Sequence, residues 1–199
     1  SFKEFPTNGV VRGLKNRDEW SKIRNSRMYD DIYESPKQLI HFNGISSDHI
    51  PDKKNKFLKN KSSGITQKGG RIEGLKILNS FLDERSKNYL KNLSKPEYSI
   101  ESSSRLSPFL SNGVISVKEI IHEYRKRKEG NFNTGNLKGL KRNISAFNSR
   151  LSWRCHFIQK LEDQPQIEFK SMHPAYEGIR DEFINELYFK LWKEGRTGF

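Results

Sequence analysis

The chain has 199 residues, which is enough for one domain or one and a half. Its 37 lysine and arginine residues against 24 aspartate and glutamate residues give a formal net charge of +13, and 12% of the residues are aromatic. The aromatic content excludes a disordered chain and predicts at least one packed core. The charge favours polyanionic partners, with nucleic acid the first candidate, although an ordinary basic surface explains it equally well.

The chain carries a single cysteine, Cys155, which excludes an internal disulfide and a cysteine-based zinc cluster and is compatible with a reducing cytosol. The five histidines are scattered, so no metal site is expected. No apolar run approaches the ~20 residues that span a bilayer, and no signal peptide is visible. We therefore expect a cytoplasmic monomer that makes no membrane contact.

The first third of the chain predicts little regular structure. Residues 1–15 combine proline, Asn8-Gly9 and Gly13, a composition typical of extended chain with a turn. A helix is predicted from about Arg17 to Tyr33, before Pro36. Residues 38–70 are polar and carry no helical period, which predicts a long surface connection.

From Gly70 onward the pattern predicts helices, and no segment alternates as a long strand would. One helical stretch ends at Pro96 and places its apolar residues at helical spacing: Ile72, Leu75, Leu78, Leu82 and Tyr89. A short helix is predicted at 108–111, with Ser107 as its N-cap, and another begins at a capping box made by Ser116 and Glu119. Residues 137–162 form the longest periodic segment, and 175–193 the last. The fold is therefore predicted to be mainly α, multi-helical, after an irregular N-terminal segment.

The stretch 101–113, "ESSSRLSPFLSNG", places four serines and an arginine ahead of Pro108. A helix that begins here offers free amide donors and a partial positive charge. Hydroxyls at Ser103, Ser104 and Ser107 and the cation of Arg105 surround the same point, which suits a phosphate or pyrophosphate. The alternative is an ordinary capped helix after a serine-rich loop, and these residues alone favour it.

A second candidate site lies in the longest helix. Arg154 falls in a gap of its apolar stripe, whose members are Leu137, Leu140, Ile144, Phe147, Leu151, Ile158 and Leu161. An unpaired buried guanidinium is costly, so an anionic partner is expected nearby. Arg150 lies one turn earlier, and Trp153 and Phe157 flank the pair, which suits a phosphate-bearing or nucleobase-bearing ligand. Pairing of Arg154 with a buried carboxylate, with Trp153 in the core, is about equally favoured.

Four segments in order resemble the photolyase/cryptochrome family and cover about residues 69–199. They are "GGRIEGLKILNSFLDERSKNYLKNLSKP", "SSRLSPFLSNGVIS", "SWRCHF" and "LYFKLWKEGRTGF". They are similar to the family's flavin-contacting helix, its "TSRLSPYLxxGxLS" segment, its "xWRxF" helix and its "W..G.TGYP" turn. Each motif is weak alone, but the combination is specific.

The resemblance implies an FAD cofactor and double-stranded DNA with a pyrimidine lesion as partner. The implied cofactor-binding residues are Tyr89, Ser103, Ser104, Arg105, Leu106, Ser107, Phe147 and Arg154. The implied substrate-binding residues are Arg150, Trp153 and Phe157, with Trp153 packed against a flipped lesion. No catalytic residue is assigned.

The chain also departs from the family pattern. Ser103 replaces a threonine, and Arg150 stands where enzymes that repair cyclobutane dimers usually carry a glutamate that accepts hydrogen bonds. The chain is expected to be a piece of a longer protein, because the family's N-terminal α/β antenna domain and everything after "EGRTGF" are missing. Residues 1–68 would be the interdomain linker and first helix, and 69–199 a partial FAD-binding domain.

The favoured hypothesis is a fragment of a light-driven, FAD-dependent photolyase-like lyase that repairs pyrimidine lesions by electron transfer. The fragment alone is expected to bind FAD poorly and to repair nothing. A cryptochrome-like blue-light photoreceptor with the same flavin is the first alternative, and Arg150 supports it. A basic helical nucleic-acid-binding module without a cofactor is the second.

Overall fold

The structure is a computed structural model, and it describes residues 7, 9–40, 43–44, 46, 48–49, 67–129, 137–179 and 184–198. Within these ranges there is no strand, so the prediction of a mainly α fold is confirmed. The α-helices are α1 (Trp20–Tyr29), α2 (Arg71–Asp83), α3 (Tyr89–Asn92), α4 (Ser99–Ser102), α5 (Ser107–Ser111), α6 (Val117–Glu129), α7 (Leu137–Asp163) and α8 (Glu186–Lys193). In these same ranges, no helix has the length and apolar character to cross a membrane.

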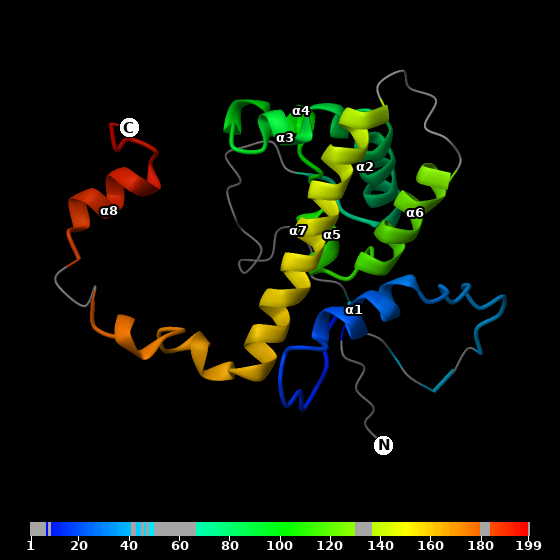
Figure 1. The fold of residues 1–199 in the computed structure, drawn as a ribbon, viewed down its shortest axis with the longest axis horizontal. Coiled ribbons are helices and arrows are strands. Elements are labelled where there is room, and N and C mark those ends of the chain that lie inside the picture. The colour runs from blue at the N-terminus through cyan, green and yellow to red at the C-terminus, as the bar shows by residue number, and fades with distance from the viewer. Residues whose placement is uncertain are drawn as a thin grey trace.

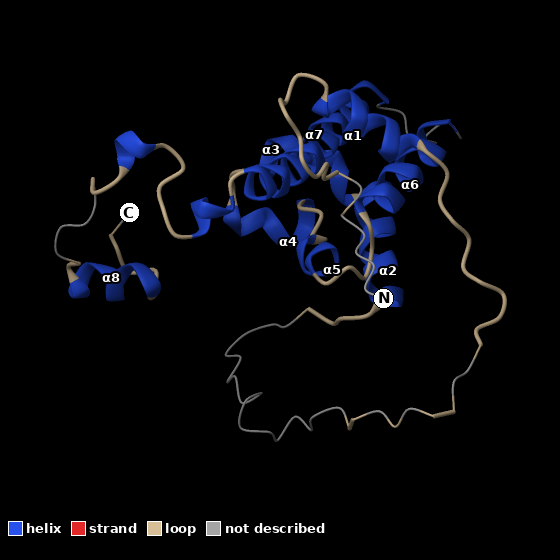
Figure 2. Cartoon of the chain, turned by 90° about the horizontal axis from the view of Figure 1, so that it is seen from below, coloured by secondary structure: helices blue, strands red, loops and turns tan. Residues whose placement is uncertain are grey.

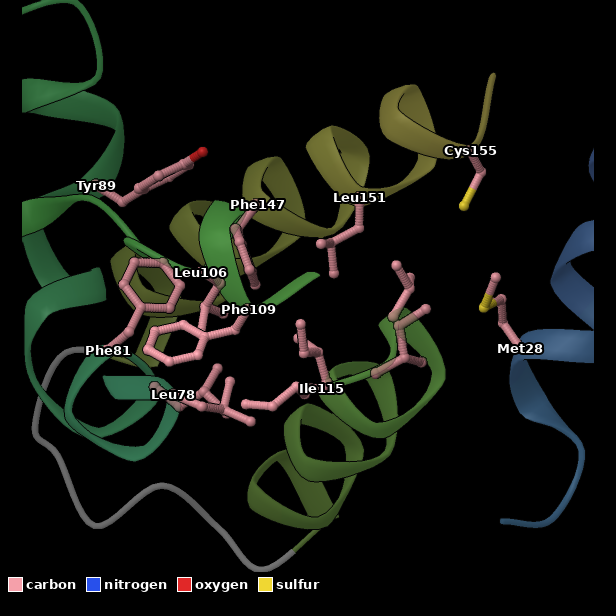
Figure 3. Packing of buried hydrophobic residues seen from close by; sticks show 14 of the residues in the cluster. Met28, Leu78, Phe81, Tyr89, Leu106, Phe109, Ile115, Phe147, Leu151 and Cys155 are labelled. Carbon is pink, nitrogen blue, oxygen red and sulfur yellow. The ribbon is translucent and has the colours of Figure 1, made fainter. Parts of the chain in front are cut away.

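The core lies between α2, α5, α6 and the long helix α7 (Figures 1 and 3). Three rings pack edge to face within it: Phe81 of α2, Tyr89 of α3 and Phe147 of α7, with centroids 4.7–5.9 Å apart. Edge-to-face pairs add about 0.5–1.5 kcal/mol each beyond the area they bury. Figure 3 shows Tyr89 at the margin of the cluster, with its hydroxyl turned away from Phe81 and Leu106. This ring cluster joins α3 to α7.

The buried stripe of α7 differs from the predicted one after Leu151. It continues through Cys155 and Gln159, both buried, whereas Leu161 is 46% exposed. The Gln159 side chain accepts from the amide of Val11 (2.6 Å) and donates to the carbonyl of Val11 (2.9 Å). The C-terminal half of α7 therefore packs against the N-terminal segment through a polar residue. The spacing of apolar residues in the sequence cannot predict such a contact.

The N-terminal segment and α1 pack against α6 and the C-terminal half of α7. α1 packs on α6, Trp20 donates its indole N–H to the carbonyl of Gly9, and Arg27 donates to the carbonyl of Val10. A side chain at Gly9 would lie 2.6 Å from the sulfur of Cys155, so only glycine allows this approach. The helix predicted from Arg17 to Tyr33 is shorter, because Asp30 is already extended (φ −63°, ψ 159°).

Other predicted boundaries are partly confirmed. The helix expected to reach Pro96 breaks at Glu84, and the chain continues as a 3-10 turn (Arg85–Asn88) and α3. Ser107 is the first residue of α5 rather than its N-cap, so that prediction is wrong by one residue. The capping box before α6 is confirmed: the Ser116 amide donates to the Glu119 carboxylate (2.8 Å) and the Glu119 amide to the Ser116 hydroxyl (3.0 Å).

The C-terminal part of the chain lies apart from the bundle (Figures 1 and 2). The helix predicted from 175 to 193 is confirmed only at its end, as α8, which Asn185 caps by accepting from the amide of Tyr188 (3.0 Å). Before it, a 3-10 turn (Pro174–Tyr176) leads to Gly178 at φ +77°, and residues 180–183 lie outside the described ranges. Most of the surface connection predicted at 38–70 also lies outside the described residues.

Gly74 tests the packing of α2 against α5 and the segment after it. An added Cβ would lie 2.7 Å from Ile115 Cδ1 and 3.0 Å from Phe109 Cδ1. Alanine is the better helix former by about 1 kcal/mol, but overpacking costs about 1–3 kcal/mol. We therefore expect Gly74→Ala to lower the free energy of unfolding by up to about 2 kcal/mol in urea titrations. Gly69→Ala, whose Cβ meets nothing within 4 Å, is the control. Higher stability of Gly74→Ala than of the unaltered chain would contradict the packing described.

Candidate functional site

Arg85 organises the serine-rich turn. It stands directly after α2, and its guanidinium donates to the carbonyls of Ile77 (2.8 Å), Ser103 and Ser104 (3.4 Å). Its Nε donates to the Ser80 hydroxyl (3.0 Å). Burial, and then the positive charge of Arg105, lower the pKa of Arg85 from its usual value. Because an arginine guanidinium is not deprotonated in proteins, the group stays a cation and binds the turn through its donors.

The turn itself holds a strained residue. Arg105 has φ +56°, in the left-handed region that side chains other than glycine rarely adopt. Its carbonyl accepts from the Gln67 side chain (2.9 Å), and the Ser104 hydroxyl accepts from the Leu106 amide (3.5 Å). The carbonyls of Ser103, Ser104 and Arg105 are thus all bound by side chains of the protein. Among the described residues, none accepts a hydrogen bond from the amides of Ser104 and Arg105, so these donors remain for another acceptor.

Tyr89 and Ser103 lie side by side. They line one small cavity of about 30 Å³, together with Asn92, Leu93, Ser99 and Ser102. Burial raises the pKa of Tyr89, and the positive charge of Arg150 opposes this rise, so the phenol keeps its proton near neutral pH. A cavity of this size holds about one water, so any larger ligand lies on the open side of the turn. Phe147 touches the Tyr89 ring, so three of the predicted cofactor residues are brought together.

The other predicted residues of the turn differ in their burial. Leu106 is buried in the core and offers only its backbone to a ligand, whereas Ser107 is exposed at the start of α5. Arg105 is half-buried. The half-buried hydroxyls of the turn are therefore those of Ser103 and Ser104.

Arg154 does not join this turn in the structure. Its Nη2 donates to the carbonyl of Leu110 (3.2 Å), at the opposite end of α5 from Ser107. It lines a cavity of about 210 Å³ that also includes Thr7, Ser116 and Cys155. No carboxylate within the described ranges forms an ion pair with it, so the expected buried partner is not seen there. Cys155, and not Arg154, occupies the core face of α7.

A second group of side chains forms what we call the aromatic cleft: Trp20, Ser152, Trp153, His156 and Phe157. They line a cavity of about 340 Å³. Trp153 and Phe157 are 53% and 52% exposed, so the alternative that placed Trp153 in the core is wrong. The Arg150 guanidinium lies 5.4 Å from the centre of the Trp153 ring. The three predicted substrate-binding residues are therefore neighbours on one face of α7.

Two residues of the cleft were missed by the sequence analysis. Trp20 was assigned to the first helix with no further role, and His156 was treated as one of several scattered histidines. The signal for His156 is its place beside Phe157, whose ring it meets at 5.5 Å. No local pattern indicates Trp20, because its contact with His156 (5.9 Å) joins residues more than 130 positions apart.

The known proteins that are similar to this chain are photo-lyases and a cryptochrome. Residues 147–199 match the FAD binding domain of DNA photolyase. The chain is similar to a deoxyribodipyrimidine photo-lyase of Streptomyces griseus, at 29% identity over 83% of this chain and 32% of the relative. It is similar to a deoxyribodipyrimidine photo-lyase of Neurospora crassa at 30% identity, over 65% of this chain and 20% of the relative. Cryptochrome-1 of Arabidopsis thaliana is 27% identical over 65% of this chain and 18% of the relative. No solved structure matches.

A helical core, a hydroxyl-rich turn beside a buried tyrosine and an aromatic face on the longest helix thus coincide with matches to one group of proteins. The chain is similar to proteins of the photolyase/cryptochrome family, and residues 147–199 are similar to part of the FAD-binding domain of DNA photolyase. It spans about a third or less of the length of these curated relatives.

The role of Arg85 can be tested by its removal. Arg85→Ala leaves the carbonyls of Ile77, Ser103 and Ser104 without their donor. We expect a loss of about 2 kcal/mol in the free energy of unfolding, because hydrogen bonds from a charged group are strong. Lys76→Ala is the control on the same region of the chain, since its pair with Glu73 (2.9 Å) is exposed and contributes little to stability. Equal losses in the free energy of unfolding of the two variants, measured by chemical denaturation, would show that Arg85 does not hold the turn.

Proposed function

We propose that this chain forms part of the FAD-binding domain of a light-driven photolyase-like lyase that acts on UV-induced pyrimidine lesions in double-stranded DNA. The observation that carries the proposal is the turn at Ser103–Leu106, held from behind by Arg85 and bordered by Tyr89. We further propose a cytoplasmic monomer, with residues 69–199 as the flavin-binding part and 1–68 as the segment that precedes it.

The donor set of the turn fits a diphosphate. Two half-buried hydroxyls, at Ser103 and Ser104, stand beside backbone amides that have no acceptor among the described residues. Hydroxyls and amides that converge on one point stabilise an anion by charge-assisted hydrogen bonds. The left-handed residue Arg105 stores strain of about 1–3 kcal/mol, and such strain concentrates at ligand-binding sites.

FAD, when bound, supplies the light-absorbing centre and the electron that lesion repair requires. The chain's own residues bind and orient it. Ser103 and Ser104 donate to the diphosphate, the protonated Tyr89 hydroxyl donates beside them, and Phe147 fixes the Tyr89 ring from the core side. Arg154 supports the site indirectly in this proposal, because its bond to Leu110 fixes the far end of α5.

The DNA side of the proposal uses the opposite face of α7. Trp153 presents a half-exposed ring to a flipped pyrimidine, and Arg150 beside it provides a cation for the sugar–phosphate backbone. The net charge of +13 adds an attraction for DNA that is independent of sequence.

A cryptochrome-like photoreceptor is the second candidate. Its support is Arg150, which cannot accept the hydrogen bonds that a glutamate would accept from the bases, together with the similarity to Cryptochrome-1. Light distinguishes the two functions. The lyase predicts loss of pyrimidine dimers from UV-irradiated DNA when the full-length parent protein with reduced flavin is illuminated, and no loss in the dark. Lesions that persist in light with flavin bound would favour the photoreceptor.

The role of the turn at Ser103–Leu106 is tested by titrating the chain with FAD and measuring the flavin fluorescence. Ser103→Ala and Ser104→Ala should each weaken FAD binding roughly tenfold, because a hydrogen bond to a charged group contributes about 1.5 kcal/mol or more. Ser111→Ala, an exposed serine at the other end of α5, should bind FAD as the unaltered chain does.

Two results would overturn the flavin proposal. One is the absence of any saturable FAD binding by the full-length parent protein, which would leave the cofactor-free nucleic-acid-binding module as the function. The other is equal FAD affinity in all three serine variants, since the hydroxyls would then contribute nothing to the ligand.

A further inference from the structure

We propose that the aromatic cleft is a stacking site for an unpaired base of single-stranded DNA, and that Trp20 and His156 are part of it. The proposal rests on the proposed function in one respect: a flipped lesion leaves its neighbours partly unstacked, and these are the bases that the cleft would receive. It extends the DNA contact from Trp153 along α7 to the N-terminal part of the chain.

The rings of the cleft form a continuous series. Trp153 meets Phe157 (6.1 Å), Phe157 meets His156 (5.5 Å), and His156 meets Trp20 (5.9 Å). All three contacts are edge to face, with interplanar angles of 65–80°. Because neighbouring rings are nearly perpendicular, ring faces are left for a planar ligand. The cavity of about 340 Å³ lies at the lower end of the range of about 300–1,000 Å³ that small ligands occupy.

The floor of the cleft is fixed and its rim is exposed. Trp20 is only 5% exposed, and its indole N–H is bound to the carbonyl of Gly9 (3.1 Å). Trp153 and Phe157 are about half exposed. A rigid floor with exposed ring faces at the rim loses little conformational entropy when a base stacks there, and stacking contributes about 1–3 kcal/mol per base.

Cations border the cleft at both ends. Arg150 lies over Trp153, and Arg17 lies over Trp20 with its guanidinium 5.5 Å from the ring centre. Arg17 also donates to the carbonyl of His156 (3.2 Å) and pairs with Asp163 (3.5 Å), so its main effect is to fix the floor. Arg150 is exposed, which leaves it available to a phosphate on either side of a stacked base.

His156 adds a polar edge to the apolar walls. Partial burial, followed by the positive charges of Arg17 and Lys160, lowers the pKa of His156 below its usual value. The imidazole is therefore neutral at pH 7 and offers one donor and one acceptor to a base edge.

Nucleic acid fits the cleft better than a second copy of the chain does. The net charge of +13 opposes self-association, whereas it attracts a polyanion, and the exposed cation of Arg150 beside Trp153 matches a phosphate next to a stacked base. Association of two copies through these rings is accordingly an outcome that the experiment must exclude.

The test measures the binding of a fluorescein-labelled oligothymidylate of about ten nucleotides to the full chain, in the dark, by anisotropy. Phe157→Ala should raise the dissociation constant roughly 5- to 150-fold, the equivalent of about 1–3 kcal/mol of stacking. Phe157→Leu, which keeps apolar volume without a ring, should also weaken binding, whereas Phe157→Tyr should restore it. Arg150→Ala should remove one phosphate contact. The slope of the logarithm of the binding constant against the logarithm of the salt concentration should therefore become shallower by about 0.7.

Tyr98→Ala is the matched control, because Tyr98 is also a half-exposed ring beside a cation (Lys95, 5.8 Å) but lies outside the cleft. Circular dichroism checks that each variant keeps its helices. Equal affinities for the unaltered chain, Phe157→Ala and Tyr98→Ala would overturn the proposal, as would no binding of the probe. Sedimentation that shows dimers lost on Phe157→Ala would also overturn it, because a second copy would then occupy the cleft.

FAD titration of the same variants separates this proposal from the proposed function. Phe157→Ala that binds FAD normally but loses oligothymidylate supports both. A chain that never binds FAD, yet loses oligothymidylate on Phe157→Ala, contradicts the flavin function and leaves the stacking site standing. A flavin-binding chain whose cleft variants bind the probe normally contradicts the stacking site alone.

Discussion

The candidate cofactor site depends on the hydrogen bonds that the guanidinium of Arg85 donates. Its donors hold the end of α2 and the carbonyls of Ser103 and Ser104 together, so the turn cannot move independently of the helical core. With the carbonyls of this turn bound by the protein, the amides of Ser104 and Arg105 and the serine hydroxyls remain for a ligand. The half-buried cation of Arg85, together with Gln67, thus leaves the turn with donors for an anion.

The long helix α7 connects this site to the second one. One face carries Phe147 into the ring cluster beneath Tyr89, and further along the same face Cys155 and Gln159 pack against the N-terminal segment. The other face carries Trp153 and Phe157 into the aromatic cleft. Because both faces belong to one 27-residue helix, Phe147 in the ring cluster and Trp153 and Phe157 in the aromatic cleft are held in a fixed relation.

The sequence predicted the helical class and most helix positions, since apolar spacing and the Ser116–Glu119 capping box are local features. It also predicted that Tyr89, Ser103 and Phe147 belong together, through the resemblance to a family. The predicted core face of α7 was wrong after Leu151, because a gap in an apolar stripe does not show that the stripe continues through Cys155 and a polar Gln159. Arg85 and Trp20 were missed because their partners lie 18–19 and more than 130 positions away, at distances that no local pattern encodes.

The central claim is that an anionic diphosphate binds the donors of the turn that Arg85 fixes. The most direct measurement is a ¹H–¹⁵N correlation spectrum of the chain recorded during titration with FAD. The account predicts that the amide signals of Ser103–Ser107 shift most and exchange more slowly with solvent as FAD is added, while those of α6 stay in place. Saturable FAD binding that leaves the turn's amides unchanged and shifts signals elsewhere would contradict it.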